Sequence, residues 1–127
     1  MKHLAKLPLW LLTLAALMSG WPTLTFAEPI PEVFARLGLS RDLAALLGAS
    51  KLVGAVGLHM YRWPRVRQWA QAGFVYLFGG AVVLHLAAGD TLAQMGAPLM
   101  LFALALWCAF GPDARAVEAT QLQEAHA

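Results

Sequence analysis

The sequence contains very few charged residues and a single cysteine. Only 13% of its 127 residues are Asp, Glu, Lys or Arg, whereas a soluble domain carries about 25%. Because Cys108 is the only cysteine, an intramolecular disulfide and a CxxC redox motif are both excluded. No zinc, Walker or dinucleotide-binding motif occurs, and a net charge of +2 does not indicate a nucleic acid partner. The sequence therefore predicts neither catalytic residues nor metal ligands.

The chain is instead rich in long hydrophobic stretches. Hydrophobic residues make up 60% of it, and a helix of about 20 apolar residues spans the roughly 30 Å hydrocarbon core of a bilayer. Stretches of this kind with almost no charge cover residues 7–27, 43–61, 68–89 and 91–112. We therefore predict an all-α fold: a four-helix transmembrane bundle with short loops over residues 1–112, and a polar cytoplasmic tail at 113–127.

The positive charges are divided unevenly between the two sides of the predicted bundle. One side carries Lys2, Lys6, Arg62, Arg65, Arg67 and Arg115. The other side carries only Arg36 and Arg41. Because cytoplasmic segments of membrane proteins are enriched in Lys and Arg, we expect both termini in the cytoplasm. The expected location is the inner membrane of a bacterium.

The first hydrophobic stretch has two interpretations. Lys2 and Lys6 precede it, and residues 25–27 resemble the small-residue cleavage site of a signal peptide. However, the uncharged run is longer than the roughly 7–15 apolar residues of a typical signal sequence. This length favours a retained helix, while cleavage of residues 1–27 stays open at this point.

The connection between the first two spans contains signals for a short helix. Pro29 and Pro31 interrupt the preceding backbone, and residues 32–37 have apolar side chains at helical spacing. Gly38 is suited to end this helix in a left-handed conformation. Ser40 is placed to cap the second transmembrane helix.

The segment YRWPRVRQW, residues 61–69, is typical of a membrane interface. Tyr and Trp gather at the level of the lipid headgroups, and Arg side chains reach the phosphates. The residues expected to anchor the chain there are Tyr61, Arg62, Trp63, Arg65, Arg67 and Trp69. The lipid bilayer is therefore a predicted partner.

Small residues are frequent in the second and third spans. Glycine lets helix backbones approach closely inside a membrane, where no hydrophobic effect separates protein from lipid. The predicted helix-packing residues are Gly48, Gly54, Gly73 and Gly80. We therefore expect the second and third spans to form the most tightly packed pair.

Lys51 is the most unusual residue, because it stands alone inside an otherwise apolar span. A charge at such depth is unfavourable by about 2.5–3.5 kcal/mol and commonly marks a functional site. By helical rise, His85 reaches the same outer half of the bundle. Lys51, His85 and Tyr76 are therefore a candidate ligand-binding cluster, with Glu28 or Asp90 as candidate neighbours. In an alternative interpretation, Lys51 extends to the outer headgroups and His85 donates to a backbone carbonyl.

His59 belongs to the opposite end of the second span, where an interfacial role is expected. It differs from His85 in depth by about 16 Å of helical rise. This difference is too large for both imidazoles to ligate one haem iron. We therefore expect no cofactor held by this chain alone.

The region from Leu47 to Asp90 resembles the DoxX-like family of small four-helix membrane proteins. The features that carry the resemblance are Gly48, Lys51 and Gly54, then Pro64 in a basic turn, then Trp69-Ala70-x-Ala72-Gly73-Phe74, Gly80-Ala81 and His85-Leu86-x-x-Gly89-Asp90. Ser19-Gly20 and residues 32–38 fit the first helix and loop of the family, so the resemblance covers roughly residues 7–112. At residues 21–24 the chain lacks the lysine that many members carry soon after Ser-Gly.

The resemblance implies a four-helix bundle in a membrane and a link to membrane redox or oxidative-stress complexes. The family takes its name from the small subunit of a thiosulfate:quinone oxidoreductase. We interpret the chain as a non-catalytic or accessory subunit of such a complex, with a redox protein as partner and quinone as the candidate ligand of Lys51 and His85. Two alternatives stay open: a membrane chaperone or assembly factor, and a small-molecule transporter acting as a homo-oligomer.

Overall fold

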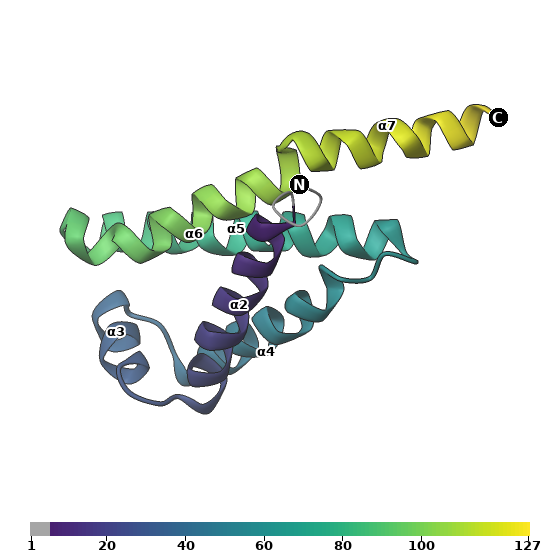
Figure 1. Ribbon diagram of the computed structural model, residues 1–127. Coiled ribbons are helices and arrows are strands. Elements are labelled where there is room, and N and C mark those ends of the chain that lie inside the picture. The colour runs from purple at the N-terminus through teal and green to yellow at the C-terminus, as the bar shows by residue number, and fades with distance from the viewer. Residues whose placement is uncertain (1–5) are drawn as a thin grey trace.

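The computed structural model describes residues 6–127, except for the side chains at positions 113, 114, 117, 118 and 121. Lys2, which contributes to the expected topology, lies outside the described residues. Every regular element of the described chain is a helix (Figure 1), which confirms the all-α class. These helices are α2 (Leu7–Thr25), α3 (Ile30–Leu37), α4 (Arg41–Gly57), α5 (Pro64–Ala87), α6 (Leu92–Phe110) and α7 (Pro112–His126).

Three helices of the described chain, α2, α5 and α6, are long and apolar enough to cross a membrane. The predicted second span corresponds to α4, which has 17 residues and ends at Gly57 rather than at residue 61. The chain then forms turns, and Trp63 adopts a backbone conformation of φ −122° and ψ 83°. Because a residue that precedes proline is restricted to extended conformations, the helix ends before Trp63 and Pro64 starts α5.

The local signals between the first two spans have the predicted effects. Gly38 ends α3 with φ 72°, a left-handed conformation that favours glycine. The Ser40 side chain accepts a hydrogen bond from the Leu43 N–H at 3.2 Å and so caps α4. The Ser40 cap and a short helix that ends before Gly38 are confirmed, but the helix begins at Ile30 and not at residue 32, because Pro31 fits the first turn of a helix and does not interrupt it.

The helices are arranged as two closely packed pairs. One pair consists of α2 and α4, and the other of α5 and α6, which lie side by side in Figure 1. Contacts between α4 and α5 are fewer, so the expectation that the second and third spans form the tightest pair is wrong. The reason lies in the position of the glycines, because Gly48 faces α2 and not α5.

Gly48 allows the backbones of α2 and α4 to come into direct contact. A Cβ atom at this position would lie 2.3 Å from the Leu24 nitrogen, much closer than van der Waals contact. Gly54 faces α5, where a Cβ would lie 2.9 Å from the Phe74 ring. Gly73 and Gly80, predicted to pack helices, instead face open space in the described chain, with nothing within 4 Å of a Cβ. Neither glycine therefore makes a close contact with a neighbouring helix of the described chain.

The buried core is small and joins both pairs. Its members are Leu9, Leu12, Ala16, Ala55, Leu58, Phe74, Phe78 and Ala105. In the most apolar 18-residue stretch of each membrane-capable helix, only a minority of the residues is buried inside the molecule. The buried share is 33% in α2, 17% in α5 and 11% in α6. Most of the apolar helix surface therefore faces outward, as expected for helices that lie among lipids or other membrane helices.

We predict that Gly48→Ala destabilises the protein, because the added methyl group overlaps the Leu24 backbone. Overpacking of this kind is unfavourable by about 1–3 kcal/mol. Thermal unfolding of the purified protein in detergent, followed by tryptophan fluorescence, measures the effect. The matched control is Gly80→Ala, which adds the same methyl group in open space and, inside a helix, is favourable by about 0.5–1 kcal/mol. Equal melting temperatures for the two variants would contradict the proposed contact.

Candidate functional site

A groove lies between α4 and α5, and none of the predicted ligand-binding residues Lys51, His85 and Tyr76 lines it. Its volume is about 460 Å³, within the range of roughly 300–1,000 Å³ that is usual for small-molecule sites. The residues that line it are Ala49, Ser50, Val53, Gly54, Val66, Trp69, Ala70, Gly73, Phe74 and Leu77. The groove is therefore almost entirely apolar.

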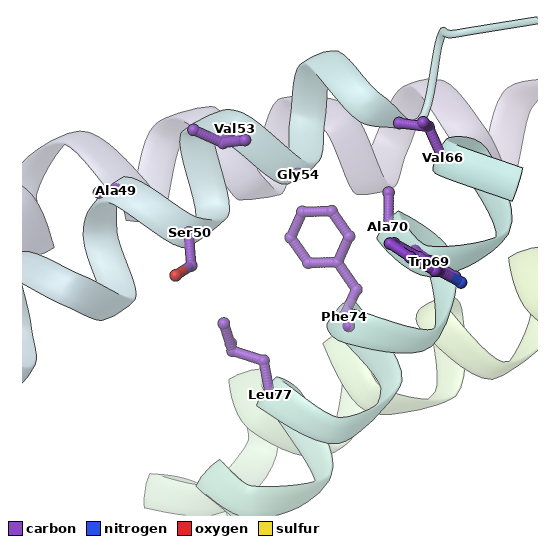
Figure 2. Close-up of a pocket in the computed structure, with 10 residues that line it drawn as sticks. Ala49, Ser50, Val53, Gly54, Val66, Trp69, Ala70, Phe74 and Leu77 are labelled. Atoms are coloured by element: carbon purple, nitrogen blue, oxygen red, sulfur yellow. The ribbon is translucent and has the colours of Figure 1, made fainter. Parts of the chain in front are cut away.

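Phe74 forms the inner wall of the groove, as Figure 2 shows. Its ring points from α5 toward Gly54 of α4 and is 2% exposed. The space left by the Gly54 hydrogen atom is thus taken by the Phe74 ring and not by a ligand. Ser50 provides the hydroxyl group of the groove, and this hydroxyl donates to the Leu46 carbonyl at 2.7 Å.

Lys51 follows Ser50 in α4, and the base of its side chain lies against α2. A Cβ atom on Gly20 would lie 3.0 Å from the Lys51 Cβ. The Lys51 side chain is half-buried. Within residues 6–127 it forms no hydrogen bond or ion pair, so its ammonium group has three hydrogen atoms to donate.

His85 lies in the last turn of α5, where its side chain contacts Asp90 and not Lys51. Gly89, with φ 76°, ends α5, and the Asp90 N–H donates to the His85 carbonyl at 3.0 Å. This turn brings the Asp90 carboxylate to the Nδ1 atom of His85. Asp90 Oδ2 also accepts from Arg36 Nη2 of α3 at 3.2 Å.

This Arg36–Asp90–His85 cluster is deeply placed, since the Asp90 side chain is 4% exposed and the His85 side chain 11%. In the described chain no hydrogen bond or ion pair connects His85 to Lys51 or to Tyr76, which is 81% exposed. The joint ligand site of these three residues stays a prediction. The sequence did not predict Arg36 as the partner of Asp90. The available indication was that both residues belong to loops predicted on the same side of the membrane, where Asp90 is the acidic residue of the loop between α5 and α6.

A second cluster lies where α2 begins and where the chain enters α5. Thr13 donates its hydroxyl hydrogen to the Leu9 carbonyl at 2.8 Å, so the 2.8 Å contact with His59 is a hydrogen bond from His59 Nε2–H to Thr13 Oγ1. The His59 ring also lies 4.5 Å from the Trp10 ring, centroid to centroid. His59 thus connects the start of α2 to the turn after α4.

The predicted interfacial anchors are well exposed. Tyr61 is 52% exposed, Trp63 56% and Trp69 78%. Trp69 in addition lines the groove between α4 and α5. Arg67 differs from the neighbouring arginines, because its Nε donates to the Leu58 carbonyl at 3.1 Å. This bond fixes Arg67 against the end of α4.

The model of the DoxX-like family matches residues 8–108 of the chain. The matched region includes all three membrane-capable helices, α3, α4 and both polar clusters. No curated protein and no solved structure matches the chain.

We predict that Asp90→Asn destabilises the fold. The substitution removes the charge that pairs with Arg36 and His85 inside a nearly buried site, and a buried group left without its partner is unfavourable by about 1–3 kcal/mol. A lower melting temperature in detergent is the expected result. The control is Glu28→Gln, an exposed carboxylate in the same region of the chain. If both variants melt at the wild-type temperature, Asp90 does not hold α3 in place.

We also predict a loss of stability in mildly acidic solution that depends on His59. This residue lies beyond the end of α4, and burial, together with the charge of Arg67, lowers its pKa from 6.5. Below pH 6.5 the unfolded chain therefore binds more protons than the folded chain, so stability falls as the pH decreases and is fully present above that value. Melting temperatures between pH 7.5 and 5.5 measure this dependence.

The pH dependence should be weaker in His59→Gln, which keeps a donor for Thr13, and in Arg67→Gln, which removes the nearby positive charge. His126→Gln, an exposed residue at the end of α7, serves as the control. An unchanged pH profile in His59→Gln would show that another group causes the loss.

Proposed function

The chain belongs to the DoxX-like family, and from this premise we propose that it is a non-catalytic accessory subunit of a membrane redox complex. The feature that carries the proposal is the apolar groove between α4 and α5, which we assign to a quinone. In this proposal the redox partner supplies the electron-carrying centre. The accessory subunit then holds the quinone at a fixed depth in the membrane.

We further propose that α4 is the fourth spanning helix. Its 17 residues rise about 25 Å, and a short span is accommodated by local thinning of the bilayer or by flanking polar residues that reach the interface. With this arrangement the start of α2, the turn before α5 and the end of α6 lie on one side. Their Lys and Arg residues favour the cytoplasmic side of a bacterial inner membrane.

The outward faces of the spanning helices support a role inside a larger assembly. Only 17% of the most apolar stretch of α5 and 11% of that of α6 are buried within the molecule. On α5, Gly73 and Gly80 leave open space at the surface. A helix of a partner subunit packs closely on such a surface, because small residues allow near contact of backbones.

The groove has the chemistry that a quinone requires. A quinone is a flat apolar ring with two carbonyl acceptors, so it needs apolar walls and a hydrogen-bond donor. The walls come from Val53, Phe74 and Leu77. Since the Ser50 hydroxyl already donates to Leu46, we assign the donor role to Lys51, the next residue of α4. Lys51 does not line the groove and the base of its side chain lies against α2, so its long side chain has to extend around α4 to reach the quinone.

Lys51 is suited to this role because its ammonium group has no partner within the described chain. A quinone carbonyl would give this charge the acceptor that it lacks. His85 and Tyr76 complete the proposed polar set from α5. Of these two, His85 is already engaged by Asp90, so we expect its contribution to be the smaller one.

A photoreactive quinone analogue tests the proposal. We predict strong labelling of the wild-type protein in nanodiscs and loss of labelling in Gly73→Leu, because a leucine at this position fills the groove without meeting another atom of the chain. Labelling should fall about tenfold in Lys51→Leu, the effect of losing a hydrogen bond worth about 1.4 kcal/mol. Mass spectrometry of the labelled peptides gives the position.

The matched control is Gly80→Leu, which places the same side chain in open space on α5 but outside the groove. Labelling that persists in Gly73→Leu would remove the quinone site. Cross-linked purification from native membranes tests the partner: recovery of a redox protein supports the proposal. Recovery of unrelated membrane clients, with normal function in Lys51→Leu, would instead favour an assembly factor.

A further inference from the structure

Two positive charges converge on one aromatic ring at the start of the bundle. The Lys6 ammonium lies 5.9 Å from the centre of the Tyr61 ring, and the Arg67 guanidinium lies 4.7 Å from the same centre. Each contact is favourable as a cation–π interaction of about 0.5–1 kcal/mol at an exposed site. Both positive charges therefore lie within 6 Å of the centre of one ring, and an anion bound beside that ring would be attracted by both of them.

No carboxylate of the described chain neutralises these charges. The ion pairs among residues 6–127 involve Asp90, at the other end of α5, and neither Lys6 nor Arg67 takes part in them. The sequence also contains no Asp or Glu between Asp42 and Asp90. The terminal nitrogens of Arg67 are therefore available as donors, while its Nε is fixed on the Leu58 carbonyl.

The cluster lies where two of the membrane-capable helices begin. Lys6 immediately precedes α2, and Arg67 lies in the first turn of α5. Both helices thus begin here, and their N-terminal ends add partial positive charge to the two side chains. Tyr61, Trp63 and Trp10 are exposed aromatic residues around it, as is usual at the boundary between headgroups and hydrocarbon.

From this geometry we propose that Lys6, Arg67 and Tyr61 form a binding site for a phosphate group, occupied in the membrane by the headgroup of an anionic phospholipid. The phosphate lies between the two cations and accepts hydrogen bonds from Arg67 and from the Tyr61 hydroxyl. This site is separate from the groove between α4 and α5, and it does not depend on the function proposed above.

The state of His59 supports an unneutralised positive charge at this place. After burial, the charge of Arg67 is the second cause that lowers the pKa of His59. The guanidinium of Arg67 is therefore close enough to His59 for its positive charge to act on the imidazole.

Lipid-dependent thermal stabilisation of the full-length protein in detergent tests the site. Phosphatidylglycerol should raise the melting temperature of the wild-type protein, and phosphatidylcholine should have a much smaller effect. The lipid concentration at half-maximal stabilisation should increase about fivefold in Lys6→Gln and in Arg67→Gln, the equivalent of about 1 kcal/mol for each cation near an anionic lipid surface. Stabilisation by inorganic phosphate alone would identify free phosphate as a second source of the same group.

Arg62→Gln and Arg65→Gln are the matched controls, because they remove the same charge from exposed arginines that have no contact with the Tyr61 ring. Both controls should bind phosphatidylglycerol as the wild-type protein does. If they weaken binding as much as Lys6→Gln, the attraction belongs to the basic segment as a whole and the specific site is refuted. Equal stabilisation by phosphatidylcholine in all variants would also overturn it. Lys6→Gln removes the cation–π contact with Tyr61 but no side-chain hydrogen bond of the described chain, so each variant is compared with its own melting temperature in the absence of lipid.

Discussion

The direct contact between the backbones of α2 and α4 is the constraint on which the rest of the structure depends. At Gly48 the space between the two helices is smaller than one methyl group. This contact fixes the face of α4 that meets α2, and so determines that Gly54 and Ser50 face α5. It also places the base of Lys51 beside Gly20. A membrane interior offers little hydrophobic force between helices, so close packing of this kind is the main source of their affinity.

The two ends of the molecule handle charge in opposite ways. At one end, Asp90 lies between Arg36 and His85, so that a buried carboxylate is shared by an arginine of α3 and a histidine of α5. At the other end, Lys6 and Arg67 lie over an aromatic ring, and no carboxylate among the described side chains is in contact with them. The first arrangement is complete within the chain and holds α3 in place. In the second arrangement the charges of Lys6 and Arg67 have no described carboxylate as a partner. The second end therefore attracts anions from the surroundings, whereas the first does not need them.

The fold could be predicted from the sequence where a local cause was sufficient. Gly38, Ser40 and Pro64 set helix boundaries through their own backbone or side-chain chemistry, and the apolar runs revealed the membrane class. Helix pairing could not be predicted in this way. A glycine shows that a neighbouring helix can approach closely, but it does not show which helix does so. Gly73 and Gly80 are as suited to close packing as Gly48, yet neither makes a contact in the described chain. Depth along the helix indicated Asp90 only as one of several possible neighbours of His85, because the turn at Gly89 decides where the Asp90 carboxylate lies.

The pairing of helices also has a consequence for the order of assembly during synthesis. α2 finds its main partner in α4, and α5 finds its own in α6, so each strong contact joins elements that leave the ribosome in quick succession. The first pair can be complete before α5 has been translated. With α4 as the fourth spanning helix proposed above, the chain enters the membrane as two successive helix pairs, and the smaller contacts of α4 with α5 and of α2 with α6 form last. A translocon then never has to retain more than one unpaired helix at a time.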